Sequence, residues 1–259
     1  MNDSPNPAAA AMSMLRARRV SIPEPRGDAV AAHDSLGPIL DALRTSGIAS
    51  LPAHQDALRD YRDQLSGYSP DQMSPTEALA FWLNLYNAGS LDAASTAFNE
   101  DVGSVLRIPG AFSSTWTTID DEALSLNDIE HGKIRRFGDP RIHSALVCGS
   151  ASCPTLRYEP FVGSELDTQL DDQMRAFLRS GGATVDRQGD TIRLSRIFLW
   201  YGRDFTNPHT MPNLAPAKPE RLRDTVAWWL GEDDREFVWE TAPAVEFQAY
   251  DWALACSIA

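Results

Sequence analysis

The chain has 259 residues, of which 43% are hydrophobic, and this is enough to bury the core of one domain. Its formal net charge is −13 at pH 7. A surface this acidic repels phosphate backbones and anionic lipid headgroups, so we expect neither nucleic acid nor a membrane as a partner. No run of about 18 apolar residues occurs, so the sequence predicts no transmembrane helix.

The N-terminal residues 1–27 predict a flexible tail, because this stretch is rich in Ala, Ser, Pro and Asn. Its arginines follow the small residues, and no apolar core comes after them, so we expect no secretory signal. We expect residues 28–259 to form a single α+β domain with a helical N-terminal half.

The cysteine content indicates a reducing compartment. Three cysteines are an odd number, which does not favour a disulfide framework. They are Cys148, Cys153 and Cys256. We therefore expect a cytoplasmic protein.

A long central helix is predicted from residue 75 to about residue 98. Ser74 can cap it, Pro75 suits the first helical position and Glu77 can complete a capping box. Its apolar residues lie nearly all round, so it should be buried. The amides of Asn84 and Asn87 then need partners, either in neighbouring loops or in a ligand. We treat Asn84 and Asn87, with Tyr86 beside them, as candidate substrate-binding residues.

A further helix is predicted over residues 125–137, and helical spacing also occurs from about residue 28 to residue 66, before the central helix. Glu130 falls in the middle of its apolar stripe, with His131 at the edge of the stripe. A carboxylate in that position is costly unless charges or hydrogen-bond donors meet it. We therefore expect Glu130 to be buried and bonded to a histidine or to an arginine such as Arg141.

The remaining elements are predicted from local patterns. Residues 142–148 are expected to form a buried strand that carries His143, followed by a turn in which Pro154 opens a helical segment. The later elements expected are a helix over 164–180, a hairpin of 184–186 with 191–194, a last helix from Pro219, and strands near 237–240 and 245–247.

The densest group of reactive side chains is Glu130, His131, His143, Cys148 and Cys153. A cysteine hydrolase needs a thiolate, a histidine that transfers a proton and a group that orients the imidazole. Cys153 is the preferred nucleophile, because free N–H groups at the start of a helical turn stabilise a thiolate and an oxyanion. Cys148 is the second choice, His143 or His131 the base, and Glu130 the orienting group.

Other interpretations of the same residues stay open. Both cysteines can be inert packing residues. They can also join His131 or His143 in a zinc site, although no second ligand pair with typical spacing is present. A redox pair of Cys148 and Cys153 lacks the usual CxxC spacing. We expect no metal and no cofactor.

Five ordered blocks resemble the domain-of-unknown-function 547 family, in its bacterial-type form. They are residues 81–88 (FWLNLYNA), 124–132 (LSLNDIEHG), 139–154 (DPRIHSALVCGSASCP), 194–205 (LSRIFLWYGRDF) and 250–254 (YDWAL). Ser144 stands where the family usually has Phe, and Ala253 where it has Ser.

The resemblance implies a papain-like or transglutaminase-like cysteine-peptidase fold, possibly with permuted strand order. It also implies an active site of Glu130, a histidine and a cysteine. The function we expect is a cysteine-dependent hydrolase or transferase that acts on an amide, an isopeptide or a thiol-containing small peptide. The alternatives are a non-catalytic binding or scaffold module on the same fold, and a structural zinc domain.

Overall fold

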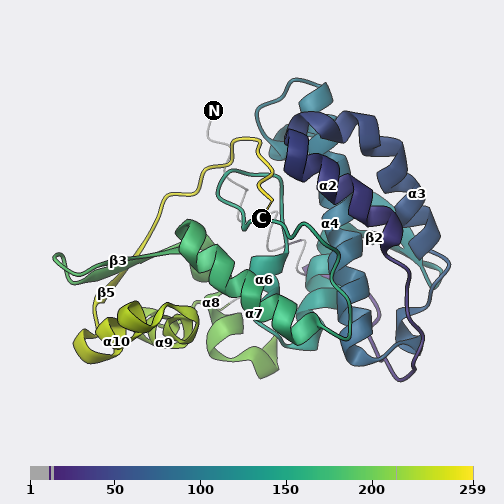
Figure 1. The fold of residues 1–259 in the computed structure, drawn as a ribbon. Helices are drawn as coiled ribbons and strands as arrows, with labels where there is room; N and C mark the ends of the chain where they lie inside the picture. Colours follow the sequence, from purple (N-terminus) through teal and green to yellow (C-terminus); the bar gives the residue numbers. More distant parts are fainter. Residues whose placement is uncertain (1–11, 13–14, 214, 259) are drawn as a thin grey trace.

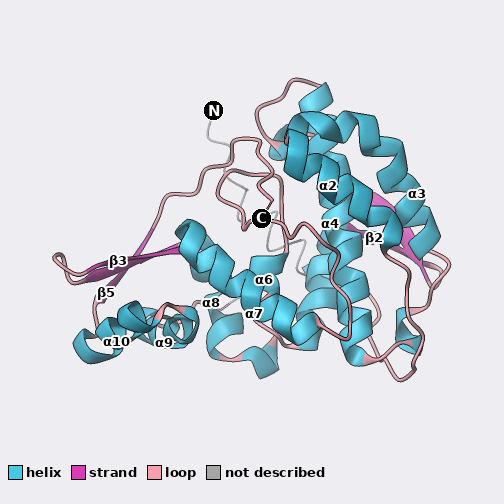
Figure 2. Ribbon diagram, viewed as in Figure 1, coloured by secondary structure: helices cyan, strands magenta, loops and turns pink. Residues whose placement is uncertain are grey.

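The computed structural model describes residues 12, 15–213 and 215–258 of the chain. The fold is α+β and mostly helical, with one two-stranded and one three-stranded sheet among the described residues (Figure 2). The longer helices are α2 (Gly37–Ser46), α3 (Gln55–Leu65), α4 (Pro75–Asn99), α7 (Leu166–Phe177), α8 (Arg196–Thr206), α9 (Pro219–Val226) and α10 (Glu232–Thr241). The strands are β1 (Thr115–Ile119), β2 (Glu122–Ser125), β3 (Ala183–Asp186), β4 (Thr191–Leu194) and β5 (Ala244–Phe247).

Helix α4 is the centre of the N-terminal half, where α3 and the short helix η2 (Ile48–His54) lie against it and α2 packs on η2 (Figure 1). The Ser74 hydroxyl accepts from the Glu77 N–H and caps the helix. Trp82 and Tyr86 are each only 3% exposed, so the prediction of a buried central helix is confirmed. The capping box is not completed, because the Glu77 carboxylate instead accepts from the N–H groups of Ala31 and Gly163.

The predicted helix over residues 125–137 is present, but its hydrogen bonding is irregular. Ser125 and Asp128 form a full capping box at the start of α5 (Leu126–Asp128). The next turn, η5 (Ile129–Lys133), is a wide π-type turn, and η6 (Ile134–Phe137) is a tight 3-10 turn. Wide turns of this kind inside helices are frequent at functional sites.

Residues 142–148 are not the predicted strand. Residues Ile142–Ala145 form the short helix α6, and the chain becomes extended only from Leu146. Asp139 accepts from the Arg141 N–H, and the Ser144 hydroxyl donates to the Arg141 carbonyl. These local bonds hold a helical turn, and among the described strands none pairs with this segment.

In the C-terminal half the hairpin of β3 and β4 is confirmed, and β5 pairs parallel with β4. The helix predicted over residues 164–180 is present as α7 followed by the wide turn η7 (Leu178–Gly182). The strand predicted near residues 237–240 is wrong, because this segment lies in α10. Helix α9 is therefore not the last helix.

The N-terminal residues 15–27, which the sequence assigns to a tail, lie against the rest of the protein. Ala17 is 1% exposed, and Ser21 binds both Glu122 and Lys133. A Cβ at Gly132 would come within 2.0 Å of Val20 Cγ2, so this segment packs tightly on the η5 turn. Residues 1–11, 13 and 14 lie outside the described residues.

The buried apolar side chains form two clusters. The first surrounds α4 and extends from Ala31 to Leu170, and the second runs from Met174 to Val238 between α7, α8, α9 and the three-stranded sheet. No helix in the part of the chain that the structure describes has the length and apolar character needed to cross a membrane.

Candidate functional site

Two cysteine thiols lie together in the loop after α6, and each is partly exposed. The Cys153 sulfur accepts from the Cys148 backbone N–H at 3.0 Å and from the Ser150 hydroxyl at 3.3 Å, and it lies 3.4 Å from the Tyr250 hydroxyl. The same two hydroxyls lie 3.1 and 3.5 Å from the Cys148 sulfur. The thiols therefore share one set of hydrogen-bonding groups.

Backbone contacts from two sides hold this loop. The Asn87 amide donates to the Ala145 carbonyl and accepts from the Val147 N–H, directly before Cys148. Gly149 has a left-handed φ of +72°, and a Cβ there would come within 2.8 Å of a Val105 methyl group. The loop thus requires glycine at this position.

The C-terminal segment runs along the other side of the loop and carries Tyr250. Ala151 donates to the Ala253 carbonyl, Ala255 donates to the Gly149 carbonyl, and Leu156 donates to the Ser257 carbonyl. This pairing explains how a tyrosine about a hundred residues away in the sequence reaches both sulfurs.

The pKa values of the two thiols are shifted in opposite directions. Burial raises the pKa of Cys153, but the hydrogen bonds from Cys148, Ser150 and Tyr250 outweigh it and bring the pKa to about 6. The hydrogen bond to Cys153, followed by burial, raises the pKa of Cys148 well above its ordinary value. One proton is therefore shared by the pair near neutral pH, and Cys153 is the thiolate.

The third cysteine lies nearby without joining the pair. Cys256 and Cys153 line the same small cavity, together with Pro154. Burial, followed by the charge of Cys153, raises the pKa of Cys256 to about 12. Cys256 therefore stays protonated and is a poor nucleophile.

Glu130 is buried, as predicted, on the η5 turn. Its carboxylate accepts from the Tyr201 hydroxyl at 2.8 Å and from the Tyr86 hydroxyl at 3.2 Å, and His131 Nδ1 lies 3.4 Å away. Burial raises the pKa of Glu130, but His131 and the Tyr201 hydrogen bond lead the effects that bring it below its ordinary value. The carboxylate is therefore ionised and satisfied by donors.

His143 belongs to a buried ion-pair network that Arg135 and Tyr201 connect to the Glu130 group. Its Nε2 lies 3.0 Å from Asp204 Oδ2, and the same oxygen accepts from Arg135 Nε at 2.8 Å. The imidazole stacks on Tyr201 with 4.1 Å between the ring centroids. Burial is the main cause that lowers the pKa of both His143 and His131.

The Tyr86 hydroxyl is bonded to Glu130, and the charges of Glu130 and the two thiols act on it. Burial raises the pKa of its hydroxyl most, and the charges of Glu130, Cys148 and Cys153 raise it further. Neither His131 nor His143 hydrogen-bonds to a sulfur within the described part of the chain. The predicted contact between a thiol and an imidazole is therefore absent from this arrangement.

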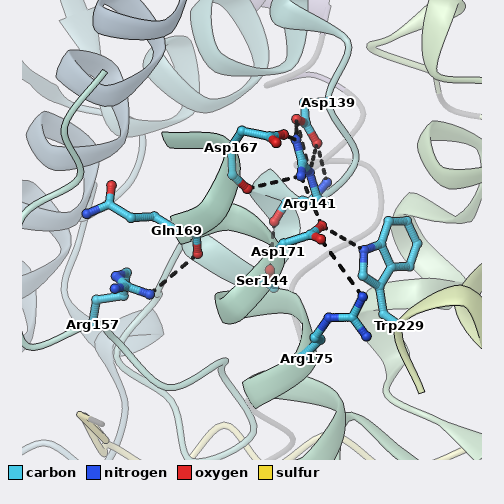
Figure 3. Close-up of polar contacts among 9 residues, drawn as sticks. All are labelled: Asp139, Arg141, Ser144, Arg157, Asp167, Gln169, Asp171, Arg175 and Trp229. Carbon is cyan, nitrogen blue, oxygen red and sulfur yellow. Dashed lines mark hydrogen bonds and ion pairs between the residues drawn. The ribbon is translucent and has the colours of Figure 1, made fainter. Parts of the chain in front are cut away.

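Arg141, one predicted partner of Glu130, is engaged elsewhere (Figure 3). It binds Asp139, Asp167 and Asp171, with closest distances of 2.7, 2.8 and 3.0 Å. Trp229 donates to Asp171 as well. This cluster links α6 and α7 to the turn after α9. Of the two kinds of partner that the sequence offered for Glu130, His131 lies beside the carboxylate and Arg141 does not.

Asn84 and Asn87 use both ends of their amides on backbone groups. Asn84 donates to the Phe161 carbonyl and accepts from the Phe161 N–H, as Asn87 does at Ala145 and Val147. The sequence left open whether these amides bind neighbouring loops or a ligand. The contacts that the structure describes are with neighbouring loops. The Tyr86 hydroxyl is bonded to Glu130.

Sequence reasoning missed five residues of this region: Arg135, Ser150, Tyr201, Asp204 and Tyr250. Three of them, Tyr201, Asp204 and Tyr250, lie in the sequence blocks 194–205 and 250–254 that resemble the family. A signal was therefore present, since a tyrosine and an aspartate inside an apolar helix need buried partners.

Among the described residues, no group of three or more His, Cys, Asp or Glu side chains is arranged to hold a metal ion. What the arrangement offers is a hydrogen-bonded thiolate, a second thiol, a tyrosine hydroxyl at the sulfur and a buried carboxylate close by.

Comparison with known proteins gives one match. No curated protein and no solved structure matches the chain. The matching family model is described as "Protein of unknown function, DUF547", and it covers residues 70–178, including α4, Glu130, His143 and both cysteines of the pair. The chain therefore contains a domain of the DUF547 family at residues 70–178.

Proposed function

We propose that the protein is a cysteine-dependent hydrolase or transferase that acts on an amide, an isopeptide or a thiol-containing small peptide. The observation that supports this proposal is the hydrogen-bonded Cys153 sulfur, whose pKa is lowered to about 6. A thiolate at neutral pH is the nucleophile that acyl transfer needs. We also infer that the domain has a papain-like or transglutaminase-like fold.

In the proposed reaction the Cys153 thiolate attacks the substrate carbonyl carbon. Because the sulfur is already ionised, the attack needs no separate base. Water supplies the proton that the departing amine takes up as the thioester forms, while the Tyr250 hydroxyl, 3.4 Å from the sulfur, stays protonated because burial raises its pKa. A water molecule or an amine then attacks the thioester carbonyl and loses its proton to solvent, and the C–S bond breaks to restore the Cys153 thiolate.

The histidines have a supporting role in this proposal. His131 lies by Glu130, and His143 is held between Asp204 and Tyr201. We propose that they keep the Glu130 carboxylate and the tyrosine hydroxyls in place. The expectation that one of them acts as the base would require its ring to turn toward Cys153.

Formation of a covalent acyl-enzyme tests the function. The protein is incubated with small acyl thioesters, and the adduct is located by intact mass and peptide mapping. We expect an acyl group on Cys153, lost in Cys153→Ser and retained in the control Cys256→Ser. If no adduct and no turnover appear although the protein is folded, the non-catalytic scaffold replaces the enzyme.

A further inference from the structure

Three aromatic side chains cluster beside the thiol pair. Trp200 of α8 packs against Tyr250 and Trp252 of the C-terminal segment, with ring centroids 4.9 and 5.5 Å away. Tyr250 and Trp252 are 4.4 Å apart. The hydroxyl of this same Tyr250 lies at both sulfurs. Tyr250 therefore contacts the two sulfurs through its hydroxyl and the two tryptophans through its ring.

The cluster is open to solvent at its outer end. Trp200 is 38% exposed, and its neighbour Leu199 is 36% exposed. The next residue on α8 has the opposite role, because Tyr201 points inward to Glu130 and His143. Aromatic side chains that stay partly exposed beside a nucleophile are suited to hold a planar apolar group of a ligand.

Positive charge flanks this surface. Arg196 and Arg203 lie four residues before and three residues after Trp200, which places them on the same side of α8. Neither guanidinium has a hydrogen bond or an ion pair with any described residue, and Arg203 Nε is buried without a partner. In a chain with a net charge of −13, two unpaired cations at one place favour an anionic ligand group.

We propose that Trp200, Tyr250 and Trp252 form a substrate platform that binds an aromatic side chain next to the bond cleaved by Cys153, while Arg196 and Arg203 bind a carboxylate. The ligand class is a short peptide with an aromatic residue and a free carboxylate close to the scissile carbonyl. This inference rests on the proposed function, because it names the substrate of the same thiolate.

Four iodoacetyl reagents separate the two recognition elements. In each case the Cys153 thiolate displaces iodide and forms a thioether. N-iodoacetyl-phenylalanine carries both the ring and the carboxylate, its carboxamide carries only the ring, N-iodoacetyl-glycine carries only the carboxylate, and iodoacetamide carries neither. The labelling rate of Cys153 with each reagent is divided by the iodoacetamide rate for the same variant, which cancels changes in the reactivity of the thiol itself.

We expect the phenylalanine reagent to exceed the glycine reagent by about ten-fold, the size typical of aromatic contacts. Trp200→Ala and Trp252→Ala should each abolish that ratio. Arg196→Gln with Arg203→Gln should remove a smaller advantage, about three-fold, of the acid over the carboxamide, and added salt should do the same. Trp228→Ala is the matched control, because Trp228 is exposed and its one ring contact among the described residues is with Trp239.

The outcomes distinguish the platform from the proposed function. If iodoacetamide labels Cys153 at neutral pH but the four reagents react at equal relative rates, the platform is wrong and the thiolate stands. If the ring gives an advantage that survives both tryptophan substitutions, the ligand binds elsewhere and the platform is also wrong. If no reagent labels Cys153 below about pH 8, the proposed function itself fails.

Discussion

At the scale of single residues, Glu130 shows why a buried carboxylate can be stable. The hydroxyls of Tyr86 and Tyr201 donate to it, and both stay protonated because burial raises their pKa values. A charge that is surrounded by donors avoids the large cost of an unpaired buried ion.

Replacing this carboxylate should destabilise the protein. Glu130→Gln keeps the shape but presents an amide to two hydroxyl donors, so we expect unfolding free energy to fall by about 3–5 kcal/mol at neutral pH. The exposed Glu236→Gln should change it by less than about 0.5 kcal/mol. Urea denaturation of the three proteins measures this, and equal stability of Glu130→Gln and wild type would contradict it.

The same substitution has a defined pH dependence. Burial acts to raise the pKa of Glu130, but the net shift is downward, below the value of the unfolded chain. The stability that the carboxylate contributes is therefore present above about pH 4.3 and is lost as the pH falls through the folded pKa. The difference between wild type and Glu130→Gln should shrink in acid.

At the scale of elements, the sequence predicts those whose signals are local and strong. Helix α4 follows from the Ser74 cap and its length, and the hairpin of β3 and β4 follows from its turn. The segment 142–148 misled because a short apolar run fits a strand and a buried helical turn equally well. For α10, the acidic first turn from Glu232 to Asp234 was the helix signal, and the apolar run near Phe237 hid it.

The candidate site could be predicted only in part, because local sequence patterns reveal only what a residue's own helix determines. The burial of Glu130 follows from its own helix, so spacing alone reveals it. Its partner Tyr201, the Asp204 carboxylate on His143 and the Tyr250 hydroxyl on Cys153 are 71, 61 and 97 residues from the groups they meet. Contacts of that separation depend on the tertiary fold, which no local pattern contains.

The Asn87 amide joins helix α4 to the loop that carries Cys148 and Cys153. Asn87→Ala leaves the buried Ala145 carbonyl and Val147 N–H without a partner, and each loss should cost about 1–3 kcal/mol. Asn87→Asp keeps an acceptor for Val147 but turns a buried carboxylate toward the Ala145 carbonyl, so it should be destabilised at least as much. Thermal unfolding ranks the three proteins, and a stable Asn87→Ala would show that the loop is held by other contacts.

At the scale of the whole molecule, the two apolar clusters are joined by buried polar networks. Arg135, which is 0% exposed, follows Ile134 of the first cluster in η6. It forms an ion pair with Asp204 of α8, the helix that contributes Phe205 to the second cluster. The Arg141 cluster makes a further link between α6, α7 and the turn after α9 (Figure 3). The candidate site therefore depends on both halves of the chain.

Cutting the buried link should affect the entire fold. Asp204→Ala deprives Arg135 and His143 of their shared carboxylate, and we expect a loss of about 3–5 kcal/mol. Asp234→Ala removes an exposed pair with Arg187 and should cost no more than about 1 kcal/mol. Denaturation followed by tryptophan fluorescence compares them, and similar midpoints would mean that the network contributes little.

The pH dependence of Cys153 alkylation tests the central claim, a hydrogen-bonded thiolate at Cys153, most directly. Iodoacetamide labelling is followed by peptide mapping in wild type, Cys148→Ala and Tyr250→Phe. The account predicts that Cys153 of the wild type titrates with a midpoint near the pKa of about 6, and that Tyr250→Phe, which lacks one hydrogen bond to sulfur, titrates at higher pH. Labelling that begins only near about pH 8.5, the ordinary value for cysteine, would contradict it.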